Sequence, residues 1–212
     1  MKNADFAGLL CSRLCHDLVS PVGAMSNGVE LLHDKGNADM QEQIVDLLED
    51  SVVQTTNKLK FFRLAFGLGG GFGAVINLEE AKLALASLFD KSKVTIAWSS
   101  DVAAADKNLM KILLNLALVA GECVIGEGIL SISLEGLESD AEELIIIKAS
   151  GARLIIHESV ASAVEKSLSD VDADPKSIPV CLAKSLSLEN GLGIRLDRGN
   201  ETEMTFIVSK QG

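Results

Sequence analysis

Tyrosine is absent from the 212 residues, and aromatic side chains make up only 4% of them. A core built without tyrosine and with a single tryptophan has to be filled by Leu, Ile, Val and Ala. Such residues are plentiful, since 48% of the chain is hydrophobic and its mean hydropathy is +0.29. Disordered chains are poor in them. The composition therefore predicts a folded chain with an aliphatic core, in one large domain or two small ones.

Long apolar runs are lacking as well. No segment reaches the roughly 18 apolar residues that a membrane-spanning helix needs. The N-terminal stretch MKNADFAGLL has neither the long apolar region nor the small-residue cleavage site of a signal peptide. We therefore expect a cytoplasmic protein with no membrane partner.

Positive charge is scarce. The chain has 19 Lys and Arg against 30 Asp and Glu, which gives a formal net charge of −11. Proteins that bind nucleic acid concentrate Lys and Arg on one surface, and the sequence shows no such cluster. It therefore predicts no nucleic-acid partner, and solubility is a sufficient reason for the acidity.

Cysteine is limited to Cys11, Cys15, Cys123 and Cys181. Their spacing matches no zinc-binding pattern, and a cytosolic setting disfavours disulfides. We expect no bound metal, and we expect all four cysteines to be small, buried apolar side chains.

Two stretches near the N-terminus carry apolar residues at helical spacing. In residues 4–33 these form one stripe: Phe6, Leu10, Leu14, Leu18, Met25, Val29 and Leu32. In a second helix, which ends near residue 66, they again lie on one side: Met40, Ile44, Leu47, Leu48, Thr55, Leu59, Phe62 and Phe66. A short turn between two such helices predicts an antiparallel hairpin. One hairpin cannot enclose both stripes, so we expect a homodimer in which two hairpins form a four-helix bundle.

A glycine-rich segment follows the second helix, with the sequence GLGGGFG at 67–73. It follows a helix rather than a strand and precedes no Gly-Lys-Ser/Thr, so it does not fit a phosphate-binding loop. Because glycine-rich segments are flexible, we interpret it as a linker. The predicted domains are a helical hairpin at 1–67, a linker at 68–73 and a mixed domain at 74–212.

From residue 74 onwards the pattern alternates between helix and strand. Four helices are predicted, at 78–89, 106–124, 157–168 and 178–190. Five strands are predicted, at 93–98, 129–136, 142–150, 192–199 and 203–210. Helices among strands that are mostly joined as hairpins indicate an α/β sandwich with helices on one face. The whole chain is thus expected to be of the α+β class.

His16 is expected to face solvent. At about 100° per residue it projects roughly 160° from the mean direction of the apolar stripe. The residues that share its face are mostly small: Leu9, Ser12, Arg13, Ser20, Gly23 and Asn27. Another protein could therefore approach the ring closely, and we predict a partner-binding surface there. Asp17 projects nearer the edge of the stripe.

An exposed imidazole beside a carboxylate suits phosphoryl transfer. With an ordinary pKa of about 6.5, a neutral imidazole is a nucleophile near pH 7. Asp17 can hydrogen-bond one ring nitrogen of His16, which fixes the tautomer and supports the charge that develops on attack. A metal ion and an aspartate can come from the partner, and positioning supplies the rest. Taken alone, however, such a pair is more often a solvated surface pair, as we expect of His33 and His157.

The segment His16-Asp17-Leu18-Val19-Ser20-Pro21 resembles the phosphoacceptor box of two-component sensor histidine kinases, which reads His, Asp or Glu, two variable residues, a small polar residue and Pro. The resemblance implies that His16 accepts the phosphoryl group and Asp17 is its acid–base partner. It implies a supporting role for Ser20 and a helix bend at Pro21. The hairpin then resembles a dimerisation and histidine phosphotransfer domain.

Residues 74–210 resemble the ATP-binding (Bergerat) domain of such kinases, but three departures stand out. Asn115 matches the first asparagine of the kinase N-box, whereas the second, a Mg²⁺ ligand, is replaced by Val119. The strand that should end in Asp-x-Gly-x-Gly reads IIIKASGARL and keeps only Gly151. The glycine-rich box before the last helix is replaced by VDADPKSIPV. Because Mg²⁺ needs oxygen ligands, we expect no nucleotide and no other cofactor to bind.

A kinase-like body with an intact phosphoacceptor box and a ruined nucleotide site resembles the ChpT family of bacterial histidine phosphotransferases. The stretches HDLVSPVGAMSNGVELL and FFRLAFG carry this resemblance. It implies transfer from the receiver domain of a hybrid kinase, through His16, to the receiver domain of a response regulator similar to CtrA or CpdR, with Mg²⁺ on the receiver. Two alternatives remain, a divergent ATP-dependent kinase and a non-catalytic scaffold. ATP binding would favour the first, and full activity of His16→Ala in cells would favour the second.

Overall fold

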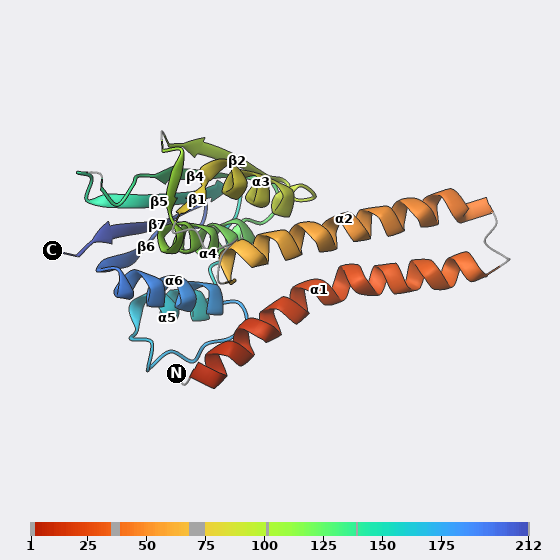
Figure 1. Cartoon of the computed structure of the whole chain (residues 1–212), viewed down its shortest axis with the longest axis horizontal. Helices are drawn as coiled ribbons and strands as arrows, with labels where there is room; N and C mark the ends of the chain where they lie inside the picture. The colour runs from red at the N-terminus through yellow and green to blue at the C-terminus, as the bar shows by residue number, and fades with distance from the viewer. Residues whose placement is uncertain (1–2, 35–38, 68–74, 101, 139, 212) are drawn as a thin grey trace.

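The N-terminal third of the chain is a helical hairpin in the computed structural model, which describes residues 3–34, 39–67, 75–100, 102–138 and 140–211. Helix α1 spans Asn3–His33 and helix α2 spans Gln41–Ala65. The two helices run side by side away from the rest of the molecule (Figure 1). Both were predicted within a few residues, because a long apolar period is a strong signal.

The apolar stripe of the hairpin is only partly covered within one chain. Ile44 of α2 is buried, whereas Val29 and Leu32 of the predicted stripe are 47% and 37% exposed. A Cβ at Gly28 would lie only 2.8 Å from Leu48, so the two helices approach closely at this point. Each helix thus buries one edge of its stripe and leaves the other edge open.

The rest of the chain forms a sheet covered by helices on one side (Figure 1). The five-stranded sheet has the order β2-β4-β5-β7-β6, with β2 and β4 parallel and all other neighbours antiparallel. Its strands are β2 (Val94–Ser99), β4 (Gly128–Leu134), β5 (Glu143–Gly151), β6 (Leu192–Asn200) and β7 (Glu203–Lys210). A smaller antiparallel pair joins β1 (Val75–Asn77) to β3 (Ala104–Asp106).

Strand β5 shows why only one face of the sheet is covered. Ile145, Ile147 and Ala149 are fully buried, while Ile146 and Lys148 between them are partly exposed. Because successive side chains of a strand point to opposite faces, one face of the sheet packs on helices and the other faces solvent.

Four helices accompany the sheet: α3 (Leu78–Phe89), α4 (Lys107–Cys123), α5 (Glu158–Glu165) and α6 (Ile178–Glu189). Local signals start two of them. Asn77 accepts a hydrogen bond from the backbone N of Glu79 at 2.8 Å, and Asp106 accepts one from the N of Asn108 at 2.7 Å. Such N-caps satisfy backbone donors that a helix start leaves unpaired.

Helix α4 is the centre of the core, and all but a few of its side chains are buried. The end of α2 joins the same core through Phe61, Phe62, Leu64 and Ala65. The hydrophobic core therefore continues from the hairpin into the sheet layer, so the hairpin is anchored at that end.

The predicted α+β class is confirmed, as are the five strands and the four later helices. The small β1–β3 pair was missed, because strands of three residues are too short to show an apolar alternation. The predicted linker at 68–73 lies outside the described residues, and the division into domains stays a prediction. None of the helices in the described part of the chain is both long and apolar enough to span a bilayer.

Candidate active site

His16 lies on α1 with 78% of its side chain exposed. Its exposure was expected from the helical period and is confirmed. Nδ1 of the ring lies 3.1 Å from Oδ1 of Asp17, whose side chain is only 15% exposed. A proton on Nδ1 would be donated to this carboxylate, and the lone pair would then lie on Nε2. The arrangement is thus suited to a nucleophilic Nε2.

Pro21, in the middle of α1, explains how the turn that carries His16 and Asp17 is held in place. Pro21 has no N–H, so the backbone carbonyl of Asp17, four residues earlier, loses its helical partner. Nζ of Lys58, on α2, donates a hydrogen bond to that carbonyl at 2.7 Å. Figure 1 shows that α1 changes direction along its length, as proline in a helix interior causes. Lys58 therefore ties α2 to the turn that carries His16 and Asp17.

Arg13 does not lie on the open surface where it was predicted. Its side chain is 4% exposed and contacts the described residues from 75 to 211, which we call the sheet domain. Nε donates to Oδ2 of Asp17 at 2.8 Å, Nη2 donates to Oε1 of Glu122, and Nη1 donates to the carbonyl of Pro175 at 3.3 Å. The prediction was wrong because a helical wheel of α1 cannot show that another domain covers this flank.

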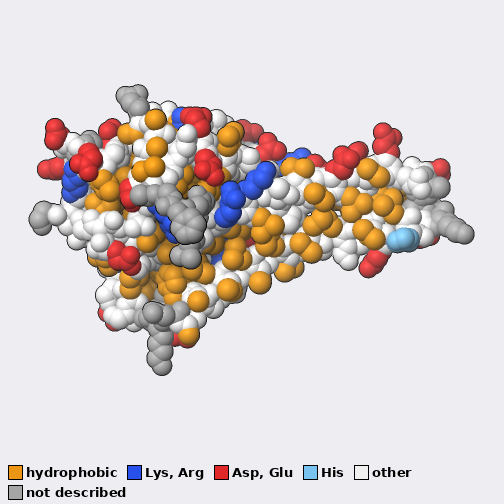
Figure 2. Space-filling view, in the orientation of Figure 1, with side chains coloured by type: hydrophobic (Ala, Val, Ile, Leu, Met, Phe, Trp, Pro, Cys, Tyr) orange, Lys and Arg blue, Asp and Glu red, His pale blue; other side chains and the backbone are white. Residues whose placement is uncertain are grey.

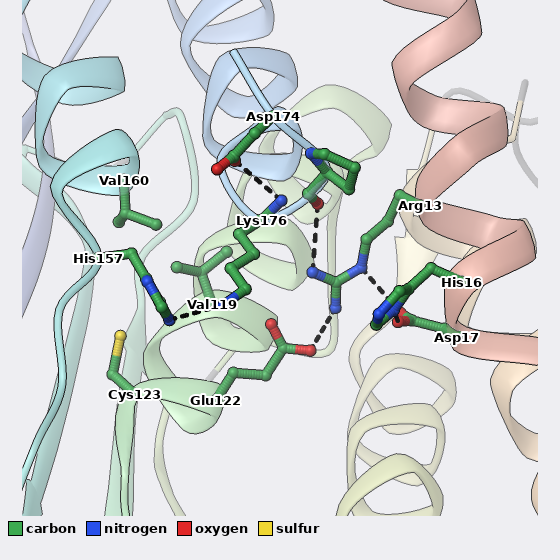
Figure 3. A pocket seen from close by; sticks show the side chains of 11 residues that line it. Arg13, His16, Asp17, Val119, Glu122, Cys123, His157, Val160, Asp174 and Lys176 are labelled. Atoms are coloured by element: carbon green, nitrogen blue, oxygen red, sulfur yellow. Dashed lines mark hydrogen bonds and ion pairs between the residues drawn. The ribbon is translucent and has the colours of Figure 1, made fainter. Parts of the chain in front are cut away.

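A cavity of about 460 Å³ separates the histidine helix from the sheet domain (Figure 3). It is lined by residues of α1, α4, the start of α5 and the segment before α6: Arg13, His16, Asp17, Val119, Glu122, Cys123, His157, Val160, Asp174, Pro175 and Lys176. Nζ of Lys176 lies 3.0 Å from Nε2 of His157 across it. The cavity therefore lies between the hairpin and the sheet domain.

Charge in this region is balanced by close pairing. Burial by itself lowers the pKa of the Arg13 guanidinium, but its ion pairs with Glu122 and Asp17 raise that pKa above its ordinary value. Desolvation raises the pKa of the Glu122 carboxyl, and Arg13 opposes this rise. Charge-assisted bonds of this kind are stronger than neutral ones, so Arg13 is firmly held.

The residues expected at a nucleotide site serve other purposes. Asn115 is fully buried, and its Nδ2 donates to the carbonyls of Ala65 at 2.9 Å and Lys111 at 2.8 Å. Val119 presents an apolar side chain to the cavity. In place of a glycine loop, Oδ1 of Asp174 accepts hydrogen bonds from the backbone N of Lys176 and of Ser177. Among the described residues, no three His, Cys, Asp or Glu side chains are grouped to hold a metal ion.

The other predicted surface residues lie on the His16 side of α1. Ser12, Ser20 and Asn27 are exposed, whereas Leu9 and Gly23 are partly exposed. Leu9 also packs against the hydrophobic core. A Cβ added at Gly23 would meet nothing within 4 Å, so the space beside it is open.

The prediction that all four cysteines are buried was half wrong. Cys123 and Cys181 are buried, whereas Cys11 and Cys15 are exposed on α1. All four cysteines carry free thiols in this structure.

The sequence argument missed Glu122, Lys58 and the Pro175 carbonyl. A signal for Glu122 was present, since it is the one acidic residue in the apolar helix 107–123. Its partner was not readable, because Arg13 is 109 positions away.

Comparison with known proteins agrees with this architecture. The family model of the histidine phosphotransferase C-terminal domain matches residues 78–202. The protein phosphotransferase ChpT of Brucella abortus (strain 2308) is 37% identical over 144 residues, which are 68% of this chain and 68% of that protein. A solved structure of a bacterial phosphotransferase has a TM-score of 0.83 and 27% identity, over 99% of this chain and 98% of that one.

The fold described above is thus shared, over nearly the whole chain, with a solved bacterial phosphotransferase. Both the family model and the curated relative cover most of the chain. The chain belongs to the histidine phosphotransferase family.

Proposed function

We propose that this protein relays phosphoryl groups between receiver domains through a phosphohistidine at His16. The observation that carries the proposal is the exposed ring held by Asp17 through Nδ1 at 3.1 Å. Membership of the histidine phosphotransferase family supports it. The geometry of the site supports the role proposed for each side chain.

Nε2 of His16 attacks the phosphorus of an aspartyl phosphate on the donor receiver. An N–P bond forms as the P–O bond to the donor aspartate breaks, and that aspartate leaves as a carboxylate. The imidazole becomes cationic, and Asp17 stabilises it through the Nδ1 proton. The reverse sequence delivers the phosphoryl group to the aspartate of an acceptor receiver. Mg²⁺ is expected on the receiver, where it neutralises charge on the transferred group.

The phosphoryl donor is proposed to be a protein rather than ATP. The cavity below His16 presents the apolar Val119 where the resemblance placed a Mg²⁺ ligand, and Asn115 is committed to backbone carbonyls. Both observations support a nucleotide site that has lost its function. A hybrid-kinase receiver as donor and a response regulator similar to CtrA or CpdR as acceptor, in the cytoplasm, are the partners we propose.

We also propose that the protein works as a homodimer. Several apolar residues of the hairpin are between 42% and 51% exposed, and we call five of them the apolar seam: Val22, Val29, Val45, Val52 and Leu59. They recur at seven-residue spacing on each helix, as in helices that pack knobs into holes. Figure 2 shows apolar side chains along the visible face of the hairpin. A second copy would cover them in a four-helix bundle.

The receiver is proposed to dock on the His16 side of α1, over Leu9, Ser12, Ser20, Gly23 and Asn27. Ser20 lies one turn from His16 and is exposed, which suits a supporting role beside the transferred group. Because the space at Gly23 is open, Gly23→Trp should block docking without disturbing the fold. Unchanged transfer by the folded variant would place the docking surface elsewhere.

The test uses a receiver domain phosphorylated on aspartate with labelled phosphate. The wild type should acquire an acid-labile, alkali-stable label, and His16→Ala should acquire none. His33→Ala is the matched control, because His33 is also an exposed histidine of α1, and it should label normally. Equal labelling of the wild type and His16→Ala would refute the proposal.

A further inference from the structure

Arg13 connects the helix that carries the histidine to α4 through a carboxylate on each side of its guanidinium (Figure 3). Nε donates to Oδ2 of Asp17 at 2.8 Å, and Nη2 donates to Glu122. Asp17 holds Nδ1 of His16 with its other oxygen at 3.1 Å. The contacts therefore form one continuous line from the sheet domain to the imidazole.

The sheet domain decides where the guanidinium lies. A long arginine side chain loses much rotamer freedom when it is fixed, and α1 alone offers it only the Asp17 carboxylate. Glu122 and the Pro175 carbonyl hold the other two nitrogens. The turn at Pro175 is itself fixed by Asp174, which accepts backbone hydrogen bonds on its far side. Held in this way, the planar guanidinium of Arg13 can orient the plane of the Asp17 carboxylate.

The buried charge of Arg13 also indicates a role for Glu122. Arg13 is 4% exposed, so its positive charge is shielded from water and has to be met by protein groups. With Glu122 present, the guanidinium is shared between two carboxylates. Without Glu122, Asp17 would be the only carboxylate paired with the guanidinium, beside the neutral carbonyl of Pro175, and Asp17 would be drawn away from the His16 ring.

We propose that Glu122 is a positioning residue for phosphoryl transfer. Acting through Arg13 and Asp17, it keeps the His16 ring in the tautomer with the proton on Nδ1 and the lone pair on Nε2. Its effect on transfer rests on the proposed function, but its effect on the ring exists without any partner. A sheet domain that binds no nucleotide would thereby contribute to the chemistry at the histidine.

The experiment compares the wild type with Glu122→Gln, which removes the charge and keeps the size. Ring ¹⁵N NMR of the unphosphorylated protein measures the fraction of His16 with its proton on Nδ1, and we expect that fraction to fall. In transfer from a phosphorylated receiver, kcat should fall by about tenfold, part of what a positioned acid–base partner supplies. KM should stay unchanged, because the docking surface is intact.

Three further variants make the test specific. Glu143→Gln removes a carboxylate that is similarly exposed and paired with Arg195, and it should change neither measurement. Glu122→Asp keeps the charge and should restore part of the loss. On an Asp17→Asn background, Glu122→Gln should add little, because residues that act through one another are not additive.

Arg13→Lys serves as a second probe if Glu122→Gln does not fold. The single ammonium group of lysine cannot replace the guanidinium, which binds three partners at once. Arg13→Lys should therefore also lower the fraction of His16 with its proton on Nδ1. An unchanged tautomer fraction and kcat in a folded variant would overturn the inference while leaving the phosphorelay proposal standing. A wild type that no receiver labels would refute the phosphorelay proposal, and the NMR result would still decide the role of Glu122.

Discussion

At the scale of single residues, neighbouring positions on α1 have very different surroundings. His16 is largely exposed, whereas Arg13, one turn earlier, is almost fully buried. The helical period of α1 was enough to predict the exposure of His16, because the part of the chain that the structure describes leaves most of that ring open to solvent. It was not enough for the burial of Arg13, because the covering groups come from Glu122 and Pro175.

The four cysteines also differ in burial, and this difference predicts their relative reactivity. Burial raises the pKa of Cys123 to about 12 and that of Cys181 to about 11, from an ordinary value of 9.0. Because the thiolate is the reactive form, both should resist iodoacetamide at pH 8 in the folded protein. Cys11 and Cys15, which are exposed on α1, should be modified first.

Mass spectrometry of the alkylated peptides measures each site. Unfolding in guanidinium should bring all four cysteines to similar rates, and this serves as the internal control. Modification of Cys123 or Cys181 in the folded protein at the rate of Cys11 would contradict the assigned burial.

At the scale of elements, the ends and bends of helices depend on groups from other helices. Pro21 releases the Asp17 carbonyl, and Lys58 of α2 binds it. The end of α2 is likewise satisfied by α4, because Asn115 donates to the carbonyl of Ala65 at 2.9 Å. The resemblance to a kinase marked Asn115 as part of a nucleotide site, but in this chain its amide stabilises the junction of two helices.

Asn115→Ala should therefore destabilise the protein without a direct effect on transfer. The Ala65 carbonyl would lose its buried partner, which costs about 1–3 kcal/mol of unfolding free energy. Urea denaturation measures the loss. Asn57→Ala is the matched control, because its 3.3 Å bond to the Ser87 carbonyl is longer and only partly buried, and it should cost less. An equal or smaller loss for Asn115→Ala would disprove this role.

At the scale of the whole molecule, the sheet domain is fully enclosed on one face while the hairpin is not. Helix α4 is buried on nearly every side. The apolar seam of the hairpin, by contrast, keeps about half of its side-chain surface open to solvent. Exposed apolar surface of this extent and periodicity marks an interaction site.

Val52→Glu should therefore weaken the proposed dimer. A charge left unpaired inside a helical interface costs about 3 kcal/mol or more, which is roughly a hundredfold in the dissociation constant. Sedimentation velocity over a range of concentrations measures this change. Ile129→Glu, at a residue of similar exposure on β4, should leave the oligomeric state unaltered. A wild type that stays monomeric, or a Val52→Glu variant that dimerises normally, would contradict the prediction.

The sequence by itself determined the helices, all strands of the five-stranded sheet and the direction of His16. These properties depend on periodicity and on caps such as Asn77 and Asp106, which act within a few residues. It also determined the pairing of His16 with Asp17, because the two are adjacent in the chain.

Only the tertiary structure decided the partners of Arg13 and Asn115 and the open edge of the hairpin. Arg13 and Glu122 are 109 positions apart, and Asn115 and Ala65 are 50 apart. Which distant groups meet depends on how the hairpin packs on α4, and no local pattern carries that information. The same packing covers one flank of α1 and leaves its apolar seam exposed.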